Sequence, residues 1–370
     1  MSSSAIHLFL SIDIYGSTKL KGAHNYSTIL EKCISESRTV NKFLDKKDDE
    51  IGPNDIYELN RDIKLYQDWS KVITDLFSDF NTCFNKFLAI EEERYPWKFL
   101  GDELIYCFEV KSEKEVYDYT LAFYKTLRSI DSKYIETKLI RLKGSAWTAG
   151  FPVRNRIIET PIPKLYMKDA TGQYKEFLYP HNDYIGPEMD IGFRIGKNTY
   201  PGFIVISLEL AYILLNKTIT DSPIDEFRVY NVGWEPLKGV WQDKKYPVLW
   251  LQLPDTYDKS KEFYYPLYKF WDREENHLLK NYDKAINGDK TIPIKSQETI
   301  TDMISELNQS ITNIIVPYFA TSEADIPSEH KTLLQFIKFI KSLEEVSSED
   351  SDNSVADTVN DVKQLLEKRK

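Results

Sequence analysis

The strongest hydrophobic pattern in the chain is an apolar run at residues 6–14, which a polar turn follows. The run is rich in β-branched side chains and has the length of a buried strand. The sequence Gly-Ser-Thr at residues 16–18 ends the run, and apolar side chains then recur at helical spacing over residues 19–45. We therefore predict a central strand that reaches Asp13, then a tight turn and a helix.

Predicted strands and helices alternate along most of the chain. A helical apolar face predicts a helix over residues 66–92, and two apolar segments that meet at Gly101-Asp102 predict a β-hairpin over 96–108. Such alternation is typical of an α+β sandwich, in which helices pack on one face of a mostly antiparallel sheet. The other predicted elements are a polar loop within 42–65, a helix at 114–129, a strand at 138–153, a variable polar excursion at 154–180, a strand at 202–207, a helix at 208–216 and a closing hairpin that includes 237–240 and 247–250.

The pattern divides the chain into one large domain and a smaller C-terminal part. Residues 1–255 form the predicted main domain, and residues 256–345 form a predicted helical region with helices at 297–318 and 332–343. Residues 346–370 combine an acidic linker with a terminal amphipathic helix. That last helix either docks on its own chain or pairs with another copy.

Composition narrows the classes of protein that the chain can belong to. The 370 residues are 42% hydrophobic and 14% aromatic, which is enough for a substantial core. The net charge of −10 and the pI near 5.2 argue against general binding to nucleic acid or to a membrane surface. No apolar run approaches the ~20 residues of a membrane helix, and the start of the chain lacks the pattern of a signal peptide. The three cysteines have no metal-like spacing, so we expect a cytoplasmic protein.

Two carboxylates stand out as candidates for chemistry. Asp13 lies near the end of a predicted buried strand, where an unpaired carboxylate is costly, and Asp102 lies at the tip of the predicted hairpin. If the two strands are neighbours, both side chains can bind two Mg²⁺ ions ~3.5–4 Å apart. The backbone of residues 16–18 offers N–H groups to an anion. The alternatives are a helix-capping Asp13, an ordinary turn at Asp102 and a plain strand-to-helix turn.

Five segments in order resemble the class III nucleotidyl cyclases. They are residues 9–18, 98–103, 142–150, 183–194 and the pair 237–240 with 247–250. The match runs from about residue 5 to about residue 254, and it implies a ferredoxin-like core. Residues 13–21 and 186–194, with the long separation of Asp13 from Asp102, resemble more closely the stand-alone pyrimidine cyclases of bacterial Pycsar anti-phage systems. In that comparison residues 42–65 resemble an insertion, which could be a surface loop, an active-site lid or an interface.

The resemblance implies a role for each of several residues. Asp13 and Asp102 would hold two Mg²⁺ or Mn²⁺ ions, with the Ile14 carbonyl as a further ligand. Arg194 is at the position of the family's transition-state arginine, although an exposed helix arginine is the alternative. The residues implied to contact the phosphates of a nucleoside triphosphate are Gly16, Ser17 and Thr18 for the β- and γ-phosphates and Lys238 from the closing hairpin.

The resemblance also identifies residues that would face the ribose and the base. Asp190 replaces the asparagine that usually faces the ribose four residues before the arginine, which puts that contact in doubt. Lys98 and Asp183 are at the base-reading positions, where a donor and an acceptor can match adenine, cytosine or uracil. The bulky neighbours favour a smaller base; they are Tyr15, Trp97, Phe99 and Tyr184.

These observations lead to one functional hypothesis and two alternatives. We expect a pyrimidine nucleotide cyclase that converts UTP, or CTP, to 3′,5′-cyclic UMP, or cyclic CMP, and pyrophosphate, as a second messenger for a separate effector in anti-phage defence. The resemblance implies a head-to-tail homodimer, in which each site takes its metal acids from one protomer and its base-reading and transition-state residues from the other. The alternatives are an adenylate cyclase of ordinary signalling and an inactive nucleotide-binding sensor.

Overall fold

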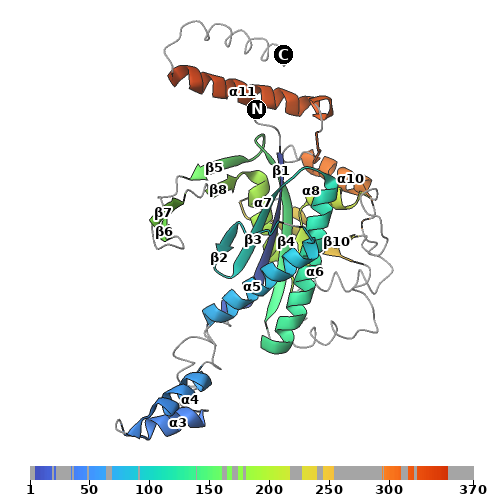
Figure 1. The fold of residues 1–370 in the computed structure, drawn as a ribbon. Coiled ribbons are helices and arrows are strands. Elements are labelled where there is room, and N and C mark those ends of the chain that lie inside the picture. Colours follow the sequence, from blue (N-terminus) through green and yellow to red (C-terminus); the bar gives the residue numbers. More distant parts are fainter. Residues whose placement is uncertain are drawn as a thin grey trace, which may run out of the picture.

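A computed structural model describes most of the chain and shows a seven-stranded sheet with helices on its faces (Figure 1). The strand order is β10-β11-β9-β4-β1-β3-β2, and all neighbouring strands are antiparallel except β4 and β9. The described residues are 5–18, 21, 35, 37–47, 50–63, 69–90, 92–138, 140–160, 165–168, 174–177, 181–216, 227–239, 245–253, 294, 296–309, 316–320 and 323–348.

Half of the sheet is a ferredoxin-like unit. Its strands are β1 (Ala5–Tyr15), β2 (Lys98–Leu100), β3 (Glu103–Val110) and β4 (Arg141–Phe151), and they lie in the order β4-β1-β3-β2. Helix α5 (Trp69–Leu88) precedes β2, and helix α6 (Glu113–Lys138) connects β3 to β4. The predicted α+β class, the mostly antiparallel sheet, the hairpin and the helix at 66–92 are therefore confirmed.

Strand β1 is the centre of the sheet because it is buried on both faces. Its even-numbered apolar residues, such as Leu8 and Leu10, belong to a core that includes Phe80 of α5 and Phe123 of α6. The odd-numbered Phe9 belongs to a second cluster on the opposite face, with its ring centroid 5.3 Å from that of Trp147. A strand that is buried on both faces reads as a continuous apolar run, which explains the sequence pattern.

Helix α7 (Pro187–Ile195) covers that second face of the sheet. It follows strand β8 (His181–Ile185) and packs on β4 through Met189 and the glycine Gly192. A β-carbon at Gly192 would overlap the indole of Trp147, so the missing side chain is what allows the helix to approach the sheet. Helix α7 carries Asp190 and Arg194, so this close packing positions two of the candidate site residues.

The second half of the sheet and its connections follow the predicted order. Strand β9 (Ile204–Ile206) is followed by helix α8 (Leu208–Leu214), and β10 (Arg228–Pro236) forms the closing hairpin with β11 (Lys245–Gln252). A short 3-10 turn, Gly196–Asn198, connects α7 to this half.

The structure corrects the prediction for two polar segments. The excursion at 154–180 contains strands β5 (Arg156–Thr160), β6 (Leu165–Lys168) and β7 (Tyr174–Phe177); β5 pairs with β8, and β6 pairs with β7. Segment 42–65 includes the end of helix α3 (Arg38–Leu44) and the whole of helix α4 (Pro53–Ile63), so it is not only a loop. The β5–β8 and β6–β7 pairs are small sheets without a large apolar face, so the alternation of apolar and polar residues did not predict these strands.

The predicted helix at 19–45 is not continuous. Ser37 has an extended backbone, and its hydroxyl oxygen accepts a hydrogen bond from the Val40 N–H, so it begins helix α3 as an N-cap. Most of residues 19–36 lie outside the described part of the chain.

The C-terminal region contains two described helices. Helix α10 (Gln297–Asn308) contributes Ile300, Ile304 and Leu307 to the main core, and Ile294 makes a β-bridge with Val229 of β10. A 3-10 turn, Glu323–Asp325, precedes helix α11 (Ser328–Ser348). The predicted helix at 297–318 was too long, because residues 316–320 are not helical and Pro317 cannot donate a helical hydrogen bond.

For much of the C-terminal part, the organisation inferred from the sequence stays a prediction. Helix α11 extends past residue 345, so the acidic linker begins later than predicted; the rest of the linker and the terminal helix lie outside the described residues. The division into a main domain at 1–255 and a helical region at 256–345 is likewise a prediction. Within the described part of the chain no helix is long and apolar enough to cross a membrane.

The substitution Gly192→Ala tests the close packing of α7. The added methyl group would force α7 away from Trp147, and we expect it to lower the free energy of unfolding by about 1–3 kcal/mol, the usual cost of overpacking. Chemical denaturation measures this change. The matched control is Gly150→Ala, where the nearest atom to the new methyl would be Glu188 Oε2 at 3.9 Å, an ordinary contact. Equal stability of the two variants would contradict the described packing.

Candidate functional site

Three carboxylates converge at the end of β1, and we call Asp13, Asp102 and Glu103 the acid cluster. Asp13 lies directly opposite Glu103 in the pairing of β1 with β3. Asp102 is at the hairpin tip, and its carbonyl accepts a hydrogen bond of 3.2 Å from the N–H of Ile14. The two predicted metal-binding residues, 89 positions apart in the sequence (102 minus 13), therefore lie on neighbouring strand ends.

Glu103 is a site residue that the sequence reasoning missed. Its carboxylate accepts a hydrogen bond of 2.5 Å from the Ser11 hydroxyl, which fixes the side chain across the two strands. Ser11, Asp13 and Glu103 face the same side of the sheet, because Ser11 is two residues from Asp13 on β1 and Glu103 is opposite Asp13. The signal was present in the sequence, since Glu103 follows Asp102 directly and hairpin pairing places it beside β1.

Two lysines provide positive charge at the acid cluster. Lys143, the neighbour of Asp13 on β4, places its Nζ 3.0 Å from Asp13 Oδ2 and 3.4 Å from the carbonyl oxygen of Gly196. Lys21 places its Nζ 3.2 Å from Asp102 Oδ1. Neither lysine was identified from the sequence. The contact with Gly196 also connects the cluster to the C-terminal end of α7.

The electrostatic environment differs among the three carboxyl groups. Burial raises the pKa of Asp13, Lys143 partly offsets this, and the Asp102 charge raises it further. Burial also raises the pKa of Glu103, which the neighbouring charges of Asp13 and Asp102 reinforce. Burial opposes ionisation of Asp102, but hydrogen bonds from Ser17 and Lys21 outweigh it and hold the Asp102 pKa below its ordinary value. The cluster is thus a site of concentrated negative charge with mutual repulsion.

The acid cluster is compatible with Mg²⁺ or Mn²⁺. Its carboxylate oxygens are ligands that such ions prefer, and a cation would relieve the repulsion between Asp13 and Asp102. Among the described residues, no group of three His, Cys, Asp or Glu side chains is arranged to enclose a metal by itself. Mg²⁺ commonly binds through one or two carboxylates together with water and substrate phosphates, and the cluster fits that kind of site.

The turn after β1 contacts the acid cluster directly. Gly16 has a left-handed backbone with φ of +73°, which favours glycine, and it allows the chain to turn next to the hairpin tip. Ser17 is buried and its side chain forms a hydrogen bond with the Asp102 carboxylate, whereas Thr18 is exposed. The turn therefore lies beside both metal candidates, and its proposed contact with phosphates remains a prediction.

Lys98 and Asp183 form an ion pair, with 2.6 Å between Lys98 Nζ and Asp183 Oδ1. Lys98 is opposite Ile105 in the β2–β3 hairpin, two residues or roughly 7 Å along the strand from Glu103. The Lys98 ammonium lies 4.3 Å from the centre of the Trp97 ring, and Tyr184 packs against the same indole. The two predicted base-reading residues are thus brought together beside aromatic side chains.

Only two of the four bulky residues lie next to this ion pair. Trp97 and Tyr184 do so, with ring centroids 5.1 Å apart. Phe99 is 61% exposed and contacts Phe77 of α5, and Tyr15 contacts Tyr200. Trp97 and Tyr184 are thus the aromatic residues that the structure places at the ion pair, and the expectation of a smaller base stays a prediction. Alternation along β2 explains Phe99, because it points away from the face that Lys98 occupies.

Arg194, Asp190 and Lys238 form a third group near the end of α7. The Arg194 guanidinium lies 3.3 Å from Asp190 Oδ1, one turn earlier on the helix. Arg194 also lies beside the β10–β11 turn, where a β-carbon at Gly239 would be 3.7 Å from Nη2, and exposed Lys238 is adjacent to that glycine. The unusual Asp190 therefore has a cationic partner on its own helix.

The beginning of α7 is held by a buried carboxylate that the sequence reasoning did not identify. Glu188 Oε2 accepts hydrogen bonds from the Gly150 N–H at 2.7 Å and from the Asn155 amide at 2.6 Å, and Oε1 is 2.7 Å from Arg154 Nε. These contacts attach α7 to the end of β4. Lys143 contacts the carbonyl of Gly196 at the other end, so the helix that carries Arg194 is fixed at both ends.

Comparisons with known proteins give structural similarity at low sequence identity. No protein-family model and no curated protein matches the chain. Solved structures that it resembles include the adenylyl cyclase CyaB from P. aeruginosa, with 13% identity, 68% of this chain and 94% of that chain covered, and a TM-score of 0.37. The guanylate cyclase domain of RhGC from Catenaria anguillulae in complex with GTP has 14% identity, 68% and 99% coverage and a TM-score of 0.37. The guanylyl cyclase Cya2 has 13% identity, 69% and 96% coverage and a TM-score of 0.33.

The substitution Glu103→Gln tests the repulsion within the acid cluster. Because the pKa of Glu103 is raised in the folded state, this group makes the fold less stable as the pH rises through its titration range. At pH 7 we expect Glu103→Gln to stabilise the protein by roughly 0.2–1 kcal/mol, the range for one cross-strand pair. The gain should vanish near pH 4 and below, where the native glutamate is protonated.

Thermal unfolding across this pH range measures the effect. Glu58→Gln, an exposed substitution in the interior of α4 with the same charge change, is the control and should shift the unfolding temperature little at any pH. A loss of stability for Glu103→Gln at pH 7, or a gain that does not depend on pH, would argue against mutual repulsion at this site.

Proposed function

We propose that the protein is a nucleotidyl cyclase of the class III type that forms a 3′,5′-cyclic pyrimidine nucleotide and pyrophosphate from UTP or CTP. The observation that carries this proposal is the convergence of Asp13 and Asp102 at neighbouring strand ends, beside the turn at residues 16–18 and two lysines. The order of the sequence segments and the ferredoxin-like core support the same conclusion.

The reaction is an in-line displacement within one nucleotide. The ribose 3′-hydroxyl gives its proton to water and its oxygen forms a bond to the α-phosphorus. The bond from that phosphorus to the bridging oxygen breaks, and pyrophosphate leaves. Asp13, Asp102 and the Ile14 carbonyl would hold two Mg²⁺ or Mn²⁺ ions, which supply neutralisation of phosphate charge and acidification of the 3′-hydroxyl. The cluster alone cannot enclose an ion, so we infer that the ions bind together with the triphosphate.

Backbone N–H groups and cationic side chains of the chain would balance the remaining negative charge of the triphosphate. The backbone of Gly16, Ser17 and Thr18 would orient the β- and γ-phosphates. Lys143, at 3.0 Å from Asp13, is close enough to the cluster to contact a phosphate oxygen as well. Arg194, with Lys238 on the adjacent turn, would stabilise negative charge that develops on the α-phosphate. Asp190 would position Arg194 by their contact on α7 and would leave the ribose to other groups.

The Lys98–Asp183 pair would select the base. In uracil, O4 can accept a hydrogen bond from Lys98 and N3–H can donate to Asp183; cytosine offers N3 and N4–H₂ in the same sense. Trp97 and Tyr184 beside the pair favour a smaller base. Adenine also presents an acceptor at N1 and a donor at N6, so an adenylate cyclase is the second candidate.

The biological setting that we propose rests on sequence resemblance to the pyrimidine cyclases of Pycsar systems. In this setting the cyclic nucleotide would act as a cytoplasmic second messenger during phage infection. It would activate a separate effector that recognises the cyclic nucleotide, with no direct contact between effector and enzyme.

We further propose a head-to-tail homodimer with shared sites. The acid cluster and the Lys98–Asp183 pair lie on the same face of the sheet, which α7 covers only in part. Aliphatic side chains are exposed around this face, including Ile157, Ile158 and Ile185, at 43%, 40% and 50% exposure. A second copy that buries them could bring its own Arg194 and Lys98–Asp183 pair to the acid cluster.

Incubation with each nucleoside triphosphate tests the proposed reaction. With Mn²⁺ and UTP or CTP we expect a cyclic pyrimidine monophosphate and pyrophosphate, resolved by chromatography, and we expect Asp102→Asn to reduce turnover roughly 100-fold or more. The matched control is Asp118→Asn, an exposed acid on α6 that pairs with Lys114. Cyclic AMP as the sole product would support the adenylate cyclase, and nucleotide binding without turnover would support an inactive sensor.

Mixed subunits test whether the sites are shared. Asp13→Ala and Arg194→Ala subunits are each expected to be inactive, but a random mixture should recover up to about a quarter of the native activity, because half of the dimers then contain one intact site. The control mixture combines Asp13→Ala with Asp102→Ala, which act from the same protomer and should not complement. Recovery in neither mixture, or in both, would count against composite sites.

A further inference from the structure

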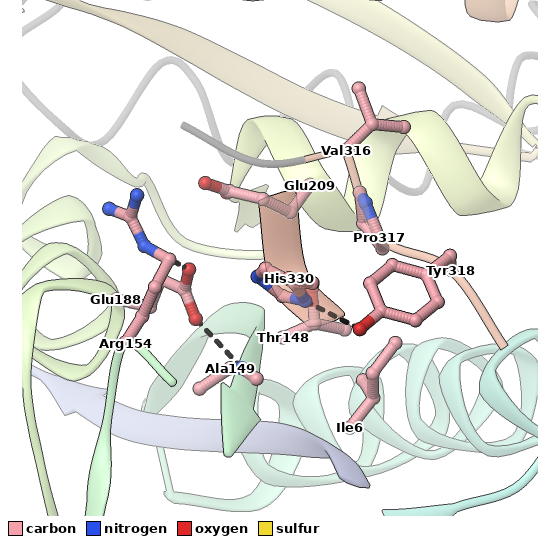
Figure 2. A pocket seen from close by; sticks show the side chains of 11 residues that line it. Ile6, Thr148, Ala149, Arg154, Glu188, Glu209, Val316, Pro317, Tyr318 and His330 are labelled. Carbon is pink, nitrogen blue, oxygen red and sulfur yellow. Dashed lines mark hydrogen bonds and ion pairs between the residues drawn. The ribbon is translucent and has the colours of Figure 1, made fainter. Parts of the chain in front are cut away.

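A small cavity of about 40 Å³ lies where the C-terminal region meets the main sheet (Figure 2). The cavity is separate from the acid cluster, because it lies at the opposite ends of β1 and β4. Its walls come from β1, β4, the start of α7, α8, the segment 316–318 and α11. The charged and polar residues of the lining are Thr148, Arg154, Glu188, Glu209, Tyr318 and His330.

Most of these polar groups have partners within the chain. Glu188 is paired with Arg154 at 2.7 Å and accepts hydrogen bonds from Gly150 and Asn155. The Tyr318 hydroxyl is hydrogen-bonded to Nδ1 of His330. Figure 2 shows the Arg154–Glu188 and Tyr318–His330 contacts on opposite sides of the cavity. The remaining acidic group of the lining is the carboxylate of Glu209.

Glu209 is a buried carboxylate that the protein compensates only in part, through hydrogen bonds from the Ser207 hydroxyl and from its own backbone N–H. It is only 4% exposed, and its Oε1 atom has no hydrogen-bond partner among the described residues. The hydroxyl of Thr148, 3% exposed, likewise has none in the described part of the chain. The only guanidinium in the lining, Arg154, is already paired with Glu188. Two carboxylates therefore share one guanidinium, and the other basic group among the described lining residues is the imidazole of His330.

An ionised carboxylate in such surroundings requires a positive charge or a proton. Burial raises the pKa of Glu209 to about 7, and the charge of Glu188 adds to this effect while Arg154 opposes it. The other titratable groups that face Glu209 are His330 on α11, Tyr318 before it, and Tyr246 on β11, whose hydroxyl accepts a hydrogen bond from the Leu208 N–H. Above neutral pH, a bound cation can replace the proton at lower cost than an unpaired charge.

We propose that this cavity is a binding site for a small monovalent cation, such as ammonium, K⁺ or Na⁺, with the Glu209 carboxylate and the Thr148 hydroxyl as ligands. One positive charge balances the excess of one carboxylate. The volume suits an ion of the size of a water molecule. A divalent ion is disfavoured, since among the described residues no group of three acidic, histidine or cysteine side chains is arranged to hold one.

The site would connect the C-terminal region to the helix that carries Arg194. Glu188 is a lining residue and also holds the start of α7, whereas His330 belongs to α11. A cation bound in this cavity by Glu209 and Thr148 would stabilise the packing of α11 against the main domain. This inference does not depend on the proposed enzymatic activity, because the ligand, the residues and the readout are all different.

The test compares unfolding temperatures of the full chain in chloride salts of equal ionic strength at pH 8. We expect ammonium, K⁺ or Na⁺ to raise the unfolding temperature by several degrees over tetramethylammonium, in a saturable manner, since a ligand that binds only the folded state stabilises it. At pH 5.5 the difference should disappear, because Glu209 is then protonated. Equal unfolding temperatures in all four salts at pH 8 would overturn the proposal and leave the cavity to water or a proton.

Two variants and one direct measurement make the test specific. Glu209→Gln should abolish the salt difference without lowering stability in tetramethylammonium, whereas Glu306→Gln, an exposed acid on α10, should retain it. Thr148→Val should weaken the cation affinity about tenfold, the loss of one hydrogen bond. If Glu209→Gln does not fold, ¹⁵N-ammonium and the native protein suffice: a protected ammonium resonance at pH 8 is expected, and its absence together with no salt effect refutes the site.

Discussion

The structure depends above all on the cost of placing carboxylates at the end of a buried strand. Asp13 is at the end of a β1 strand that is buried on both faces, and Glu103 and Asp102 lie beside it on the neighbouring hairpin. Their mutual repulsion destabilises the fold, so a purely structural role does not explain why three acids lie together. Hydrogen bonds and ion pairs reduce this cost; they come from Lys143, Lys21, Ser11 and Ser17. The pKa values of Asp13 and Glu103 are still raised, so part of the electrostatic cost remains.

Helix α7 is the second element on which the site depends. It is attached to β4 by the buried Glu188, it approaches the Trp147 indole at Gly192, and its C-terminal end contacts Lys143. Lys143 pairs at the same time with Asp13, so the helix that carries Arg194 and the acid cluster share one side chain. This arrangement explains why a small helix on an otherwise exposed face is held so firmly.

Much of this organisation could be predicted from the sequence, for a physical reason in each case. The run at 6–14 and the Gly101-Asp102 tip have strong local signals, and the pairing of two strands then brings Asp13 and Asp102 together. Lys143 was missed because its position beside Asp13 is set by the register of β1 and β4, which the order of residues does not display. Glu103 was overlooked although it follows Asp102 directly in the predicted hairpin. The Ser37 break was missed because a capping serine resembles a helix-interior serine. Glu209 was missed because a glutamate in a short helix is usually exposed, whereas most residues of α8 are buried.

Asp13 and Asp102 must bind the same ions together with a triphosphate if the protein is a class III-type cyclase. The most direct measurement is a crystal structure with Mn²⁺ and a non-cyclisable pyrimidine triphosphate, in which anomalous scattering locates the metal. We predict manganese peaks about 2.0–2.3 Å from carboxylate oxygens of both residues and in contact with phosphate oxygens. A bound triphosphate with manganese coordinated by neither carboxylate, or with the two side chains turned to separate surroundings, would contradict the central claim.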